Sequence, residues 1–167
     1  MNKRFIFLTV VVTTLFFAGM APKAFGQEPA QIGFEGWGIR FGASSDPDQV
    51  YGGIHFDLGE FVKDVRFRPT LEAGFGDHQT VLQGLGEVHY VFSHFQNLTP
   101  YLGAGLGLLY VNYDDDHPRD GSDTEGSVCA IGGIETQLGQ GTKAFFEVKV
   151  GLTDDDPDIK FGVGISW

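Results

Sequence analysis

The sequence predicts an all-β fold: an eight-stranded antiparallel up-and-down transmembrane β-barrel, preceded by a cleaved signal peptide. Three observations predict it. The last nine residues alternate strictly between large apolar and small or polar side chains, which is the period of a two-faced β-strand. Seven further segments show a two-faced strand pattern, and the first residues have the pattern of an export signal.

Residues 1–26 are predicted to be the signal peptide. Lys3 and Arg4 precede an apolar run over 5–18, and Ala24 and Gly26 are small residues suited to signal-peptidase cleavage before Gln27. The apolar run is shorter than the ~20 residues that a membrane-spanning helix needs. Cleavage leaves residues 27–167, which we expect to form one domain, the barrel.

The composition excludes some classes of protein. The chain has 22 acidic and 11 basic residues, a net charge of −11, and the segment 1–26 contains only basic ones. A nucleic-acid partner needs a basic surface, so none is expected. The single Cys129 cannot form an internal disulfide and is most simply a small buried residue. No apolar stretch after residue 26 is long enough for a membrane helix, so a mature chain that spans a membrane must do so as a closed sheet.

Taken in order, the strands are expected at 32–43, 49–58, 65–76, 80–92, 99–113, 123–138, 143–152 and 159–167. The apolar phase is clearest in six of them, the first, second, third, fifth, seventh and eighth: Trp37, Ile39 and Phe41; Ile54, Phe56 and Leu58; Phe67, Leu71, Ala73 and Phe75; Leu102, Ala104, Leu106 and Leu108; Phe146, Val148, Val150 and Leu152; Ile159, Phe161, Val163, Ile165 and Trp167. Charged residues share the other phase, apart from Glu35 near the start of the first strand.

The predicted connections fall into two groups. Those at 59–64, 93–98 and 139–142 lie at one end, together with both termini, and those at 44–48, 76–79, 114–122 and 153–158 lie at the other. Twelve of the fourteen aspartates lie at this second end, eleven in its connections and Asp123 directly after one of them. Short turns inside and polar loops outside are typical of transmembrane barrels.

Proline tests this strand assignment, because proline has no N–H to donate to a closed sheet. Pro100 fits easily at the start of its strand. Pro69 fits only if residues 65–68 stand outside the hydrocarbon zone or form a bulge.

The alternation leaves open which face points outward. A soluble periplasmic lipocalin-like barrel would place the apolar phase inside. Glycine in the polar phase favours the reverse, because small residues suit a crowded lumen. An interfacial girdle is also expected from aromatic residues near the strand ends: Trp37, Tyr51, Phe75, Tyr90, Phe92, Tyr110 and Trp167.

The segments PYLGAGLG (100–107) and FGVGISW (161–167), with the eight-strand layout, resemble the OmpA/OmpX-like family of small outer-membrane β-barrel domains. The resemblance implies residence in the bacterial outer membrane. It also implies that Phe161 and Trp167 form the signal read by the barrel-insertion machinery. We expect a monomer.

The polar phase places charged residues in the lumen, which in an eight-stranded barrel is only wide enough for side chains. Such charges must pair, because an isolated buried ion is costly. We expect a structural charge network there, with a narrow ion channel as the alternative. Its members are Arg40, Asp57, Arg66, Arg68, Glu72, Glu87, Glu135, Glu147, Lys149 and Lys160, with His55 and His89 in the same phase.

Two acidic surface loops are expected to be solvated. Neither matches a calcium-binding loop pattern, and no cofactor or metal site is expected. A further hypothesis is that divalent cations bridge them to lipopolysaccharide phosphates. The loop residues are Asp114, Asp115, Asp116, Asp154, Asp155, Asp156 and Asp158.

We expect a structural or surface-interaction role: membrane integrity, adhesion, or contact with a surface ligand through the acidic loops. A lipid A-modifying enzyme of the outer leaflet is another alternative. Such chemistry needs a serine and a histidine within hydrogen-bond reach, with an orienting acid. Ser93 and His94 would point to opposite faces of a strand, so no catalytic activity is expected.

Overall fold

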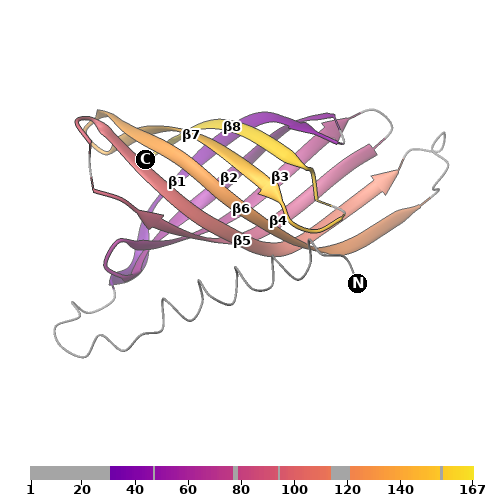
Figure 1. Cartoon of the computed structure of the whole chain (residues 1–167), viewed down its shortest axis with the longest axis horizontal. Helices are drawn as coiled ribbons and strands as arrows, with labels where there is room; N and C mark the ends of the chain where they lie inside the picture. The colour runs from indigo at the N-terminus through magenta and orange to yellow at the C-terminus, as the bar shows by residue number, and fades with distance from the viewer. Residues whose placement is uncertain (1–30, 47, 77–78, 94, 114–120, 155) are drawn as a thin grey trace, which may run out of the picture.

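In a computed structural model, the chain forms a closed barrel of antiparallel strands joined in sequence order (Figure 1). The structure describes residues 31–46, 48–76, 79–93, 95–113, 121–154 and 156–167. The predicted signal peptide, 1–26, lies outside them. The strands are β1 (Gln31–Ser45), β2 (Gln49–Val62), β3 (Val65–Gly76), β4 (Gln79–Val91), β5 (Leu98–Tyr113), β6 (Ser122–Gly139), β7 (Thr142–Gly151) and β8 (Ile159–Ser166).

The barrel is closed by pairing of β1 with β8, from Gly38 opposite Ser166 to Ser45 opposite Ile159. Trp167 extends this closure, because its backbone N–H and C=O both bond to Trp37. The predicted all-β, eight-stranded, up-and-down topology is therefore confirmed.

One predicted connection is wrong. The segment 59–64 is not a loop, because β2 continues to Val62 and pairs there with Val65. The remaining two-residue turn is possible because Asp64 adopts a positive φ of 66°. Its backbone N–H is also bonded to the Glu60 carboxylate at 3.1 Å.

The strands are irregular beside Pro69, as its missing N–H requires. Between the pairs His55–Thr70 and Glu60–Arg66, β2 carries one residue more than β3. Pro69 lies within this interval, and on its other side it faces Gly86 of β4 in regular register. A bulge in the neighbouring strand thus removes the need for the bond that proline cannot make.

The apolar phase faces outward. Leu71, Leu102 and Leu106 are between 58% and 70% exposed, whereas the charged residues of the other phase are buried. This is the arrangement of a transmembrane barrel and the reverse of a lipocalin-like one. The described part of the chain contains no helix long and apolar enough to cross a membrane.

Six of the seven predicted girdle aromatics lie on the outer wall, namely Trp37, Phe75, Tyr90, Phe92, Tyr110 and Trp167. The ring centroids of the two tryptophans are 5.2 Å apart. Tyr51 is the exception: it is 5% exposed and lies inside, with Lys160 Nζ 4.3 Å from its ring centroid. Tyr51 has the same odd-numbered, inward-facing position on β2 as His55 and Asp57. This alternation along the strand would have predicted that Tyr51 points into the lumen.

Inward glycines make room for the large lumen side chains. A Cβ added at Gly38 would lie 2.4 Å from the His55 ring, and one at Gly133 would lie 2.3 Å from the Tyr101 ring. Both distances are far inside van der Waals contact. The glycine-rich polar phase is therefore what allows a narrow barrel to hold aromatic and charged side chains.

Candidate functional site

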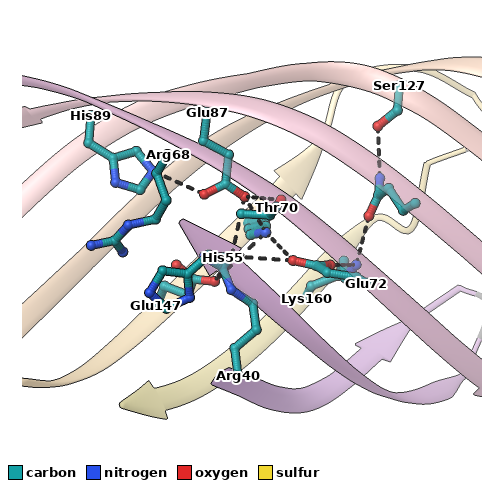
Figure 2. A network of polar contacts seen from close by, with 12 residues as sticks. Arg40, His55, Arg68, Thr70, Glu72, Glu87, His89, Ser127, Glu147 and Lys160 are labelled. Carbon is teal, nitrogen blue, oxygen red and sulfur yellow. Dashed lines mark hydrogen bonds and ion pairs between the residues drawn. The ribbon is translucent and has the colours of Figure 1, made fainter. Parts of the chain in front are cut away.

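A cluster of buried charges fills the centre of the lumen, where side chains from five strands converge (Figure 2). Arg40 Nη1 on β1 donates to Glu147 Oε1 on β7 at 2.7 Å. The same nitrogen lies 3.2 Å from Glu72 Oε1 on β3 and 3.2 Å from Glu87 Oε1 on β4. One guanidinium thus links three carboxylates from three different strands.

Two lysines complete this central cluster. Lys149 Nζ lies 2.5 Å from Glu72 Oε1 and 2.6 Å from Glu87 Oε1. Lys160 donates to Glu72 Oε2 and, at 2.8 Å, to Gln83 Oε1. The cluster then holds three cations and three carboxylates, so its formal charge balances. We define the central cluster as Arg40, Glu72, Glu87, Glu147, Lys149 and Lys160.

Neutral groups satisfy further oxygens of the cluster. Thr70 Oγ1 donates to Glu87 Oε1 at 3.2 Å, and Tyr101 Oη donates to Glu147 Oε2 at 3.2 Å. His89 Nε2 lies 3.2 Å from the second oxygen, Glu87 Oε2, but the two atoms do not form a hydrogen bond. Additional bonds such as those from Thr70 and Tyr101 are what make buried ion pairs tolerable, because Coulomb attraction alone barely offsets their desolvation.

A second ionic cluster lies nearer the end with the short turns. Arg68 Nε donates to Asp57 Oδ1 at 2.8 Å, and Arg66 Nη1 donates to Glu135 Oε2 at 3.1 Å. Lys143 Nζ, which is partly exposed, reaches Glu135 Oε1 at 3.4 Å. All ten charged residues predicted for the lumen are therefore buried within it, divided into two clusters.

Aromatic groups separate the two clusters. The Phe145 ring centroid lies 5.6 Å from Arg40 Cζ and 5.5 Å from Arg68 Cζ, so one ring contacts a guanidinium from each cluster. The His89 ring stacks on Tyr101 with centroids 4.8 Å apart. The contacts of the Phe145 ring with the two arginines replace part of the water that would otherwise surround these cations.

The expectation that Asp156 is a solvated loop charge is wrong. It is 5% exposed, and its carboxylate accepts bonds from Val128 N and Thr153 Oγ1 at 2.8 and 2.7 Å. Gln83 Nε2 donates to its other oxygen at 3.2 Å and to Ser127 Oγ at 2.8 Å. The carboxylate can be buried because three donors bond to it inside the barrel mouth, an arrangement that sequence spacing does not reveal.

Other loop residues differ from Asp156. Asp154 and Asp158 are exposed, whereas Asp114, Asp115, Asp116 and Asp155 lie outside the described residues. Within the described ranges, no group of three His, Cys, Asp or Glu side chains is arranged to hold a metal ion. The two residues predicted to form the assembly signal, Phe161 and Trp167, lie on the outer wall.

The structure brings together one serine–histidine pair that the sequence did not indicate. His55 Nε2 lies 2.9 Å from Ser166 Oγ, across β1. His55 lies on β2 and Ser166 on β8, the two strands that flank β1, so no local sequence spacing links them. His55 is fully buried and Ser166 is 4% exposed, so neither side chain is open to solvent.

Apolar side chains also occupy the lumen, which the sequence analysis did not foresee. Leu109 of β5 packs with Val81 and Val111, and Leu85 packs with Cys129 in a separate group. These residues share the inward parity of their strands. The predicted burial of Cys129 is confirmed, at 4% exposure.

Comparisons with known proteins bear on the fold. No protein-family model and no curated protein sequence matches the chain. Solved structures do match, among them two barrels. One is neisserial surface protein A, with a TM-score of 0.61 and 13% identity over 78% of this chain and 93% of that one.

The other is the N-terminal β-barrel domain of Pseudomonas aeruginosa OprF, with a TM-score of 0.59 and 14% identity over 80% of this chain and 97% of that domain. The fold is that of the small outer-membrane β-barrels. At this identity the likeness extends to the fold alone, so the role of the chain rests on its own residues.

Proposed function

We propose that this protein is a small barrel of the bacterial outer membrane with a structural and surface-interaction role. It acts as a closed membrane-spanning scaffold that carries its acidic loops to the cell surface, where they contribute to membrane integrity, adhesion or ligand contact. The central cluster is the observation that supports this proposal most strongly. Its six charged side chains are each at most 9% exposed and bridge β1, β3, β4, β7 and β8 across the lumen.

A lumen bridged in this way favours a plug over a pore. Moving an ion through it would require separating pairs such as Arg40–Glu147, and removal of one partner from a buried pair costs about 3–5 kcal/mol. The apolar group of Val81, Leu109 and Val111 adds a second obstruction inside the wall. We therefore propose a role without conduction and without catalysis.

A narrow ion channel is the second candidate, favoured by one observation. Arg40 and Lys149 contact the same two atoms, Glu72 Oε1 and Glu87 Oε1. Carboxylates shared by two cations can exchange partners without being left unpaired, and such an exchange could open a path. This mechanism needs both glutamates to be charged.

Conductance in planar bilayers separates the two candidates. A heat-dependent shift in SDS gel mobility first establishes that the purified protein from the outer-membrane fraction is a closed barrel. We expect no unitary currents from the wild type, Glu72→Gln or Glu87→Gln. Currents from the wild type that change in either variant would establish the channel instead. Recovery of the protein in the soluble periplasm, without a heat shift, would contradict the membrane role.

Export and assembly complete the proposal. We propose cleavage before Gln27, which the mass of the mature protein tests, and a monomeric barrel.

Contact with the insertion machinery is assigned to Phe161 and Trp167. Trp167→Ala should slow the appearance of the heat-modifiable form in cells, whereas Phe75→Ala, which removes a comparably exposed ring, should not. Equal rates for both variants would remove this assignment.

A further inference from the structure

The outer wall has a hollow over β2–β6, in the half of the barrel next to the acidic loops. Its volume is about 580 Å³, which lies within the ~300–1,000 Å³ range of small-molecule sites. Leu71, Leu82 and Leu108 line it, and Tyr110 and Thr124 lie opposite each other at its edge. We call this feature the wall hollow.

The wall hollow exists because outward-facing positions there lack side chains. Gly52 faces Ala73 across β2 and β3, and Gly84 faces Leu71 and Leu108 from β4. A Cβ added at Gly52 would meet only Arg40 O, at 3.9 Å. The space above these glycines is therefore open, while the leucines around it are 53–63% exposed.

Two observations indicate what fills this space. Most of the lining belongs to the apolar wall, with Gly53, Glu72 and Gln83 of the inward phase at its base, so in a membrane the hollow opens toward hydrocarbon. Charge opposes a second copy of the chain: copies inserted in the same direction would bring their acidic ends together. Asp123 is exposed beside Thr124 at the edge of the hollow, and Asp154 and Asp158 are exposed at the same end. Juxtaposed like charges cost several kcal/mol.

We propose that the wall hollow is a binding site for one acyl chain of an outer-leaflet lipid. The chain lies over Gly52, Ala73 and Gly84 between the flanking leucines, and the Tyr110 and Thr124 hydroxyls lie toward its headgroup. This inference rests on the membrane placement proposed above and adds a defined lipid site to it. Filling the space with a protein side chain should displace the lipid chain.

Gly84→Leu provides the test, with Gly132→Leu as a matched control. An added Cβ at Gly84 would meet only Leu71 Cδ2, and one at Gly132 only Leu102 Cδ2, each at 3.4 Å. Gly132 lies on β6, outside the wall hollow. Barrels are reconstituted in phosphatidylcholine vesicles containing chain-spin-labelled phosphatidylcholine. Electron paramagnetic resonance then measures the motionally restricted lipid per barrel.

We expect Gly84→Leu to lose about one restricted lipid per barrel, as one filled site requires, and Gly132→Leu to match the wild type. Equal restricted lipid in Gly84→Leu and the wild type would overturn the proposal. So would a dimer that Gly84→Leu converts to monomer in analytical ultracentrifugation. Gly52→Leu repeats the test at the less crowded of the two outward glycines of the wall hollow, and we expect the same loss of restricted lipid. The SDS heat shift is recorded for every protein, and its absence in the wild type would count against the membrane barrel instead.

Discussion

At the scale of single residues, Arg40 is the side chain on which the central cluster depends. It is 1% exposed, and one of its nitrogens contacts the carboxylates of Glu72, Glu87 and Glu147. Without Arg40, the cluster would hold three carboxylates and two ammonium groups. The excess negative charge would then be buried where water cannot stabilise it.

Arg40→Met should therefore destabilise the folded barrel by about 3–5 kcal/mol, the usual cost of breaking a buried ion pair from one side. Urea unfolding of the barrel in lipid vesicles measures this loss as a lower midpoint. Lys63→Met removes an exposed cation from the β2–β3 turn and should change stability by less than about 0.5 kcal/mol. Equal midpoints for the two variants would show that the central cluster contributes little to stability.

At the scale of elements, the connection between β7 and β8 folds back into the barrel. Asp156 accepts bonds from three groups, and Pro157 is buried beside it. A cavity of about 10 Å³ beneath them is also lined by Cys129 and Lys149. This connection therefore covers the only cysteine of the chain.

Asp156→Ala should expose Cys129 to thiol reagents. Loss of a hydrogen-bonded charged acceptor costs about 1.5–3 kcal/mol, which raises the population of the open connection roughly 10- to 100-fold. The rate of labelling by a maleimide in folded, membrane-inserted protein measures this change. Asp154→Ala removes an exposed aspartate of the same connection and should leave the rate unchanged. An unchanged rate in Asp156→Ala would mean that the connection stays closed without the carboxylate.

At the scale of the whole molecule, charge is distributed unevenly along the barrel axis. In the lumen clusters, cations are paired with carboxylates. In the connection between β7 and β8, by contrast, Asp154 and Asp158 are exposed. Unpaired acidic groups beside a phosphate-rich membrane surface repel it unless cations intervene. We proposed above that the acidic loops act at this surface, and divalent cations bridging them to lipopolysaccharide are one such contact.

EDTA tests this bridging. In vesicles containing lipopolysaccharide, chelation should lower the temperature at which the barrel loses its SDS heat shift, and added Mg²⁺ should restore it. In vesicles of phosphatidylcholine alone, EDTA should have no effect, because this zwitterionic lipid has no net negative charge to hold divalent cations beside the loops. An identical transition with and without EDTA in lipopolysaccharide would exclude the bridge.

Strand parity was sufficient to predict the fold class, because side-chain direction alternates with each residue of a strand. It also indicated which charged residues point inward, since ions avoid hydrocarbon. Tyr51 and Leu109 were missed only because the parity of their strands was not applied to apolar residues. The extra residue on β2 beside Pro69 required the structure, since a bulge depends on the neighbouring strand.

The sequence by itself determined the number of strands, their order and the face that most charged and outward apolar residues present, because these properties are local. Only the tertiary structure decided which groups meet. Arg40 reaches Glu147, 107 positions away, because closure of β1 on β8 brings β7 within reach of β1. The burial of Asp156, the pairing of His55 with Ser166 and the wall hollow arise in the same way. Each depends on the register between strands, which sets distances that no single strand encodes.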